Sequence, residues 1–148
     1  IMRALGEVQS LLGRNDEARK SYGAVIAASP QDASALNSYA QLLYRIKDPE
    51  AIRMAEKAMK LAPNQAAYAD TYGWLLAERG DLENGVRVLR EARLREPGNG
   101  QIRWHLASAL AKAGRKLEAK DELKAALAST SPPVLGPELS ALKASLGP

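Results

Sequence analysis

The sequence contains no cysteine, no phenylalanine and a single histidine among its 148 residues. Without cysteine the chain can form neither a disulfide nor a thiolate metal site, and one histidine leaves a zinc site without its usual ligands. We therefore expect no cofactor and no metal. Aromatic residues make up only 5% of the chain, whereas hydrophobic residues make up 46%. The core must be built largely from alanine and leucine, a composition that favours closely packed helices over a β-sandwich.

Long hydrophobic runs are also missing. No stretch approaches the roughly 20 apolar residues of a membrane-spanning helix, so we expect no transmembrane segment in this fragment. The chain opens at Ile1 inside a helical pattern. We therefore expect a piece of a longer protein, in which case the missing targeting signal leaves the compartment open. The net charge of +4 comes from interspersed charges, which is typical of a solvated surface rather than of a nucleic-acid-binding one.

Small residues recur with a period of 33 or 34 positions. They are Gly6, Ala40, Gly73 and Ala107 in one series, and Ala18, Ala51, Gly85 and Ala119 in a second. Prolines follow the second series at Pro30, Pro63 and Pro97. Small side chains let two helix axes approach to about 8–10 Å, and proline ends a helix. Each period therefore predicts a helical hairpin that must stack on its neighbours to bury its apolar face.

Turn residues delimit the helices. Gly13, Gly80 and Gly114 mark three hairpin turns, where glycine adopts the left-handed conformation without steric cost. The second turn, residues 46–49, lacks its glycine and is one residue shorter. There Asp48-Pro49 should start the next helix, as Asp81 should one unit later. The expected helices span about 2–12, 15–28, 33–46, 49–61, 65–79, 82–95, 99–113 and 116–128.

The pattern changes after the stretch Ser129-Thr130-Ser131-Pro132-Pro133. Gly136-Pro137 then precedes a further helix over residues 138–146, with leucines every three or four positions on one face. This helix has two readings. It either shields the end of the stack as a capping helix, which we favour, or binds a partner.

These units resemble the tetratricopeptide repeat, a 34-residue helix-turn-helix with small residues at the helix contact and a terminal proline. The resemblance covers residues 1–132, in repeats of about 1–30, 31–63, 64–97 and 98–131, and leaves 133–148 as capping helix and tail. It implies an all-α, right-handed superhelix. The chain departs from the family pattern where a tryptophan is typical early in the repeat. Those positions hold Met2, Leu36, Ala69 and Arg103.

Two runs, at residues 61–76 and 102–114, are similar to repeats of bacterial tetratricopeptide lipoproteins associated with exopolysaccharide and PEP-CTERM sorting systems. That narrower resemblance implies a periplasmic or membrane-anchored lipoprotein in an envelope export system. Without it, a cytoplasmic location is the alternative. The sequence leaves the localisation unknown.

The family resemblance also implies a concave face lined by the first helix of each repeat. Arg3 and Glu7 would begin this face. Its predicted groove residues are Asn37, Gln41, Tyr44, Arg45, Asp70, Trp74, Glu78, Gln101, Trp104, Ser108 and Lys112. Aromatic rings supply contact area there and amides can bond a peptide main chain. We therefore predict a non-enzymatic scaffold for a protein or peptide partner. Trp74 and Trp104 could equally pack between helices, whereas Tyr72 should belong to the core.

Other functions have weaker support. Some tetratricopeptide domains clamp a C-terminal carboxylate with cations. The equivalent positions here are Arg3, Glu7, Ser38, Ala67 and Thr71 or, one repeat later, Asn37, Gln41, Thr71, Gln101 and His105. Neither set makes a cationic clamp. For catalysis, Ser108, His105 and Asp70 could be combined into a triad, but one histidine is too slight a basis to predict an enzyme or a small-molecule substrate.

Two binding alternatives stay open. A basic edge could take an anionic polysaccharide or, less readily, a nucleic acid. It is formed by Lys112, Arg115, Lys116, Lys120 and Lys124. Glu118, Asp121 and Glu122 interrupt it, which favours a solvated helix face. The open N-terminal end could also mediate self-association, because the first repeat starts without a predecessor.

Overall fold

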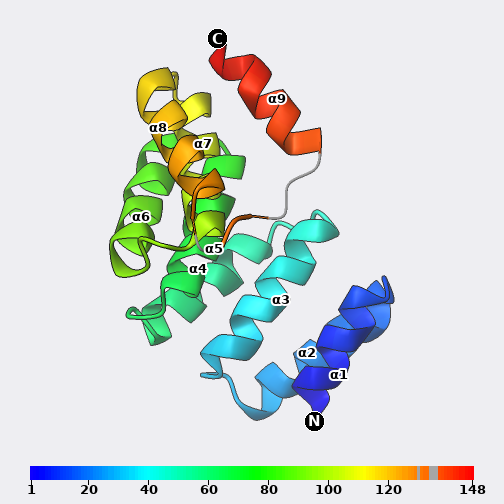
Figure 1. Cartoon of the computed structure of the whole chain (residues 1–148). Coiled ribbons are helices and arrows are strands. Elements are labelled where there is room, and N and C mark those ends of the chain that lie inside the picture. The colour runs from blue at the N-terminus through cyan, green and yellow to red at the C-terminus, as the bar shows by residue number, and fades with distance from the viewer. Residues whose placement is uncertain (130, 134–136) are drawn as a thin grey trace.

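The structure, a computed structural model, describes residues 1–129, 131–133 and 137–148. Within these ranges it consists of nine α-helices and contains no β-strand beyond one isolated bridge between Asn99 and Ser131 (Figure 1). The helices are α1 (Met2–Leu11), α2 (Asn15–Ala28), α3 (Ala33–Arg45), α4 (Ala51–Leu61), α5 (Ala66–Glu78), α6 (Leu82–Arg95), α7 (Gly100–Lys112), α8 (Lys116–Leu127) and α9 (Pro137–Leu146). The predicted all-α fold is confirmed. No helix among the described residues is both long and apolar enough to cross a bilayer.

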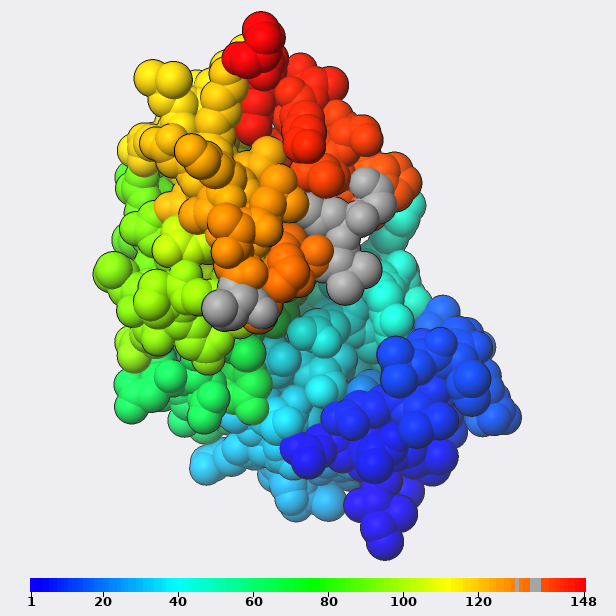
Figure 2. Space-filling view, viewed as in Figure 1, coloured from blue at the N-terminus to red at the C-terminus, as the bar shows by residue number. Residues whose placement is uncertain are grey.

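Helices α1 to α8 form four hairpins that stack in chain order. The first helix of each hairpin also packs against the first helix of the next, as α3 does on α5 and α5 on α7. The N-terminal hairpin and α9 lie at opposite ends of the stack (Figures 1 and 2). The result is a superhelix in which α1, α3, α5 and α7 share one face.

The tightest hairpin contact joins α5 and α6, where both small residues are glycines. A Cβ atom on Gly85 would lie 2.9 Å from the backbone nitrogen of Ala77 and 3.0 Å from the carbonyl oxygen of Gly73. Real Cβ atoms do not come that close to backbone, so the two helices could not keep this spacing with alanine at position 85. The small-residue series therefore marks helix contacts, as predicted.

The hairpin turns depend on one left-handed residue each. Gly13, Gly80 and Gly114 have φ values of 73°, 92° and 77°. In the second turn Lys47 takes this conformation, with φ of 59°, although it carries a side chain. The predicted start of α4 at residue 49 is wrong. The position that this repeat lacks lies between Lys47 and Ala51. Asp48 accepts a hydrogen bond from the Glu50 amide at 2.9 Å, and α4 begins at Ala51.

The segment that precedes the last helix crosses the start of α7. Asn99 caps α7 by accepting from the amides of Gln101 and Ile102, and the Gly100 amide donates to the Ser131 carbonyl at 2.9 Å. A Cβ on Gly100 would lie 2.4 Å from that carbonyl oxygen. Position 100 is therefore restricted to glycine by this crossing. Thr130 and Gly136, also part of the predicted linker, lie outside the described residues.

An ion-pair cluster forms around Arg103, at a position where the family pattern has tryptophan. Arg103 of α7 donates to Glu122 of α8 at 2.8 Å, and Arg93 of α6 pairs with the same carboxylate. Glu122 is buried, so the reading of this residue as part of a solvated face is wrong. One carboxylate instead connects three helices, which explains how a cation is tolerated at position 103.

The first helix leaves an apolar face uncovered. Val8 is 53% exposed, whereas Leu42, its counterpart one repeat later, is fully buried. Leu42 packs against Ala18 and Tyr22 of the preceding hairpin. Helix α1 has no helix before it in this sequence, so its equivalent surface remains open to solvent.

Candidate functional site

Two cavities lie along the shared face of the first helices. The central cavity, of about 600 Å³, is lined by α1, α3, α5 and α7 together with Tyr22 of α2. The C-terminal cavity, of about 720 Å³, is bounded by α3, α5 and α7 on one side and by α9 on the other. Tyr44, Trp74 and Gln101 line both cavities. The two cavities therefore form one continuous feature, which we call the groove.

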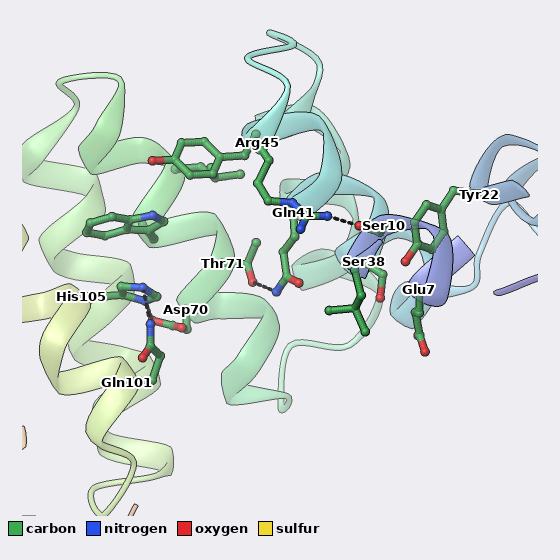
Figure 3. Close-up of a pocket in the computed structure, with 14 residues that line it drawn as sticks. Glu7, Ser10, Tyr22, Ser38, Gln41, Arg45, Asp70, Thr71, Gln101 and His105 are labelled. Atoms are coloured by element: carbon green, nitrogen blue, oxygen red, sulfur yellow. Dashed lines mark hydrogen bonds and ion pairs between the residues drawn. The ribbon is translucent and has the colours of Figure 1, made fainter. Parts of the chain in front are cut away.

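Hydroxyl and amide side chains from several helices line much of the central cavity (Figure 3). The Arg45 guanidinium donates to the Ser10 hydroxyl, and the Gln41 amide donates to the Thr71 hydroxyl at 3.5 Å. No ion pair to Arg45 is found among the described residues. Its positive charge is therefore held in the cavity by a neutral partner.

A cluster around His105 forms the opposite side of the central cavity (Figure 3). The Asp70 carboxylate lies 2.7 Å from Nδ1 of His105, and the Gln101 amide nitrogen lies 3.0 Å from Nε2. With the amide oriented in this way, Gln101 donates to Nε2 and Nδ1–H donates to Asp70. The imidazole also stacks on Trp74, with ring centroids 4.4 Å apart and planes at 21°. Its position is thus set by groups on α5 and α7.

The His105–Asp70 contact does not extend to a triad. Ser108 is buried and lines the C-terminal cavity, and no hydrogen bond joins its hydroxyl to His105 among the described residues. Nor do the described residues contain a group of three or more histidine, aspartate or glutamate side chains that could hold a metal ion.

Ionic contacts cross the C-terminal cavity between neighbouring repeats. The Lys112 ammonium pairs with the Glu78 carboxylate and lies 5.3 Å from the centroid of the Trp74 ring. The Tyr44 hydroxyl donates to the other oxygen of Glu78 at 3.0 Å. Burial raises the pKa of Tyr44, and the Glu78 carboxylate raises that pKa further. Tyr44 therefore stays a hydrogen-bond donor beyond the ordinary range of a phenol.

The predicted groove residues fall into two groups in the structure. All of them except Asn37 line one or both cavities. Asn37 is buried, and its side-chain oxygen lacks a hydrogen-bond partner among the described residues. Trp74 is half-buried, with its ring open to the groove, whereas Trp104 is 7% exposed and packs with the core leucines. Trp104 thus belongs to the core and reaches the C-terminal cavity with one edge. Tyr72 packs against the core, as expected.

Several groove residues were absent from the predicted set. His105 lies one turn after Gln101, so its place on the same face was available from the helical period. Ser38 and Thr71 had been considered only for a carboxylate clamp. Tyr22 enters from a second helix, and residues 138, 141, 142 and 145 of α9 form a wall. No local pattern marks these last contributions, because they depend on how distant helices pack.

The basic edge is partly neutralised. Lys112 is engaged by Glu78, and Glu118 lies between Arg115 and Arg90, at 2.6 Å and 2.5 Å. Lys116 and Lys124 are exposed. The arrangement agrees with a solvated helix face more closely than with a continuous anion-binding strip.

Comparisons with known proteins give one consistent family. Two tetratricopeptide repeat family models match the chain, one over residues 4–66 and the other over residues 76–146. A TPR repeat-containing protein of Pseudomonas aeruginosa is 37% identical over 100 residues, which cover 63% of this chain and 16% of that protein. The chain thus spans only a small part of this curated relative.

Solved structures give the same fold. A crystal structure of MamA is similar with a TM-score of 0.75 at 19% identity, over 86% of this chain and 75% of that chain. YrrB, described as a TPR protein with an unusual peptide-binding site, is similar with a TM-score of 0.73 at 18% identity, over 83% of this chain and 64% of that chain. At such identities these likenesses concern the fold.

Proposed function

This chain belongs to the tetratricopeptide repeat family, and we propose that it is a scaffold that holds an extended peptide segment of a partner protein in the groove. The observation that carries the proposal is the continuity of the central and C-terminal cavities through Tyr44, Trp74 and Gln101. A compact ligand needs one enclosed cavity, whereas an extended segment needs a row of connected contacts.

The chemistry of the groove fits a peptide. Gln41, Thr71 and Gln101 offer donors and acceptors that can exchange their mutual bonds for bonds to a peptide main chain. Tyr44 and Trp74 present partly exposed rings, and rigid aromatic side chains supply contact area at low entropic cost. The description of YrrB as a peptide-binding TPR protein supports the same use of this fold.

Trp74→Ala tests the proposal. A partner is first isolated by pull-down, and its affinity is measured by calorimetry. We expect at least about a tenfold loss, because truncating a central aromatic anchor commonly costs more than 1 kcal/mol. Tyr68→Ala is the matched control, because Tyr68 is a half-buried aromatic residue of the same helix that lines neither cavity. Equal affinities of the two variants would place the partner outside the groove.

The finer predictions remain to be tested. An exopolysaccharide or PEP-CTERM context, and with it a periplasmic or lipoprotein location, depends on the narrower sequence resemblance. A lipoprotein signal with a cysteine upstream of Ile1 would establish that location. Self-association through α1 is likewise a prediction, supported by the exposed apolar face around Val8. Light scattering on this chain and on a version extended at its N-terminus would test it.

A further inference from the structure

We infer that the groove contains a site for a cationic side chain, a lysine or arginine of the bound peptide, formed by the Trp74 ring, the Glu78 carboxylate and the Tyr44 hydroxyl. This inference rests on the proposed function and specifies one chemical feature of the partner. In the free chain the site is held by a cation of the protein's own, the Lys112 ammonium.

An ammonium or guanidinium group that loses water on binding needs an aromatic face and an anionic partner, and the site provides both. The Lys112 nitrogen lies 5.3 Å from the Trp74 ring centroid, within the range over which the face of an indole attracts a cation. The same nitrogen pairs with one oxygen of Glu78, while Tyr44 donates to the other oxygen at 3.0 Å. Since the hydroxyl occupies that second oxygen, the carboxylate has a defined direction toward the ring.

The Trp74 ring is also held by groups that the cation does not touch. His105 stacks on Trp74 at 4.4 Å, and Asp70 and Gln101 hold the two nitrogens of His105. Two helices therefore orient the indole before any ligand arrives. A site whose groups are already oriented loses less conformational entropy when it binds.

Lys112 can leave this site at little cost. Its side chain is 45% exposed and that of Glu78 is 25% exposed. Ion pairs of this exposure contribute little to stability, because water screens the attraction and the long side chain loses freedom. Lys112 lies in the last turn of α7, so its ammonium can turn to solvent without any change in the backbone.

The charge of the surrounding lining favours a cation. The two cavities are lined by the carboxylates Glu7, Asp70, Glu78 and Glu138 and by the cations Arg45 and Lys112. Arg3 offsets Glu7 from outside the lining, at 4.0 Å. When Lys112 turns away, Asp70 and Glu78 have Arg45 as the one remaining cation among the residues that line the two cavities. The chain as a whole carries +4, so this groove differs in sign from the rest of the molecule.

Three blocked peptides of one Gly-Ser-Ala sequence, carrying lysine, glutamate or leucine at the centre, serve as probes. Binding is followed by the shift of the Trp74 indole N–H signal in NMR titrations. We expect the lysine peptide to bind most tightly, with affinity falling as salt is added. Removing the competing ammonium in Lys112→Ala should raise the affinity for this peptide about fivefold, and Glu78→Gln should lower it by at least a similar factor.

Matched variants separate the site from overall charge. Lys116→Ala removes the same charge from the start of α8, and Glu83→Gln removes a carboxylate from α6, and both positions lie outside the groove. Both should leave the affinity unchanged. The inference is overturned if Lys112→Ala and Lys116→Ala have equal effects, or if the glutamate peptide binds best, which would assign the site to Arg45.

The two proposals can fail separately. If an isolated partner loses affinity with Trp74→Ala but not with Glu78→Gln, the groove binds its peptide without a cation at this site. In that case the scaffold function stands and the present inference falls. If neither variant changes the affinity, both are wrong.

Discussion

His105 of α7 stacks on Trp74 of α5, with 4.4 Å between the ring centroids, and thereby joins the two halves of the groove. The central cavity contains the imidazole and its partners, and the C-terminal cavity contains the other residues around the indole. The binding of a peptide that contacts Trp74 would therefore also depend on the repeat that carries His105. This contact joins consecutive first helices where the central and C-terminal cavities meet.

The two tryptophans should differ in their effect on stability. Trp104→Ala should lower the free energy of unfolding by about 3 kcal/mol, because the indole is 7% exposed and its removal leaves a cavity in the core. Trp74→Ala should cost about 1 kcal/mol, since this ring is already partly in contact with water. Urea unfolding followed by circular dichroism measures both values. Equal losses would contradict the assignment of Trp104 to the core.

Alanine at two glycines should have opposite effects. Gly85→Ala should destabilise the chain by about 1–3 kcal/mol, because the new methyl group would overlap the backbone of α5. Gly23→Ala is the control, since it also lies inside a helix but meets nothing within 4 Å. It should stabilise the chain by about 0.5–1 kcal/mol through the lower entropy of the unfolded state. Thermal unfolding of both variants tests the prediction, and a stabilising Gly85→Ala would refute it.

Glu122 should matter more than its neighbour Glu118. Glu122→Gln leaves Arg93 and Arg103 without their shared carboxylate. We expect a loss of about 1–2 kcal/mol, less than for a fully buried pair because both arginines reach solvent. Glu118→Gln, which alters an exposed pair on the same helix, should change stability little. Comparable effects of the two variants in urea unfolding would show that the ion pairs of Glu122 contribute no more to stability than the exposed pair of Glu118.

The stability of the chain at alkaline pH should depend on Tyr44. Burial and then the Glu78 carboxylate raise its pKa above the ordinary value of 10.0. A raised pKa means that folding favours the protonated phenol. This contribution is fully present below the unfolded pKa and is lost as pH rises through the folded one. We therefore expect stability to fall only above about pH 10. Tyr44→Phe should reduce the loss, and Glu78→Gln should lower the Tyr44 pKa in a phenolate absorbance titration.

Most of the fold could be predicted because the information is local and repeated. Each turn glycine adopts its conformation for reasons within a few residues, and four similar units give four chances to find the register. The exception is instructive. Residues 47–50 had lost the turn glycine and one position, and there the start of α4 was misplaced at Asp48-Pro49 instead of Ala51. A left-handed lysine is not visible in a sequence, because its side chain does not favour that conformation. In the structure the Asp48 amide donates to the Leu43 carbonyl at 2.8 Å across this residue.

The candidate site could be predicted only in outline. Helical period placed Gln41, Trp74 and Gln101 on one face, and these residues line the groove. The same period could not distinguish an indole that faces water from one that faces the next repeat, so Trp104 was left between groove and core. The burial of Glu122 was likewise hidden, because its partners lie 19 and 29 positions away.

The succession of small residues, turn glycines and prolines is enough to specify stacked helical hairpins, since each of those residues acts on its own turn or on the adjoining helix. The order of side chains along the groove follows from the same period. Which of these side chains pair with one another does not. The stacking of His105 on Trp74, the capture of Lys112 by Glu78 and the wall formed by α9 arise from contacts between helices that are remote in sequence. Their energies depend on distances that only the folded chain defines.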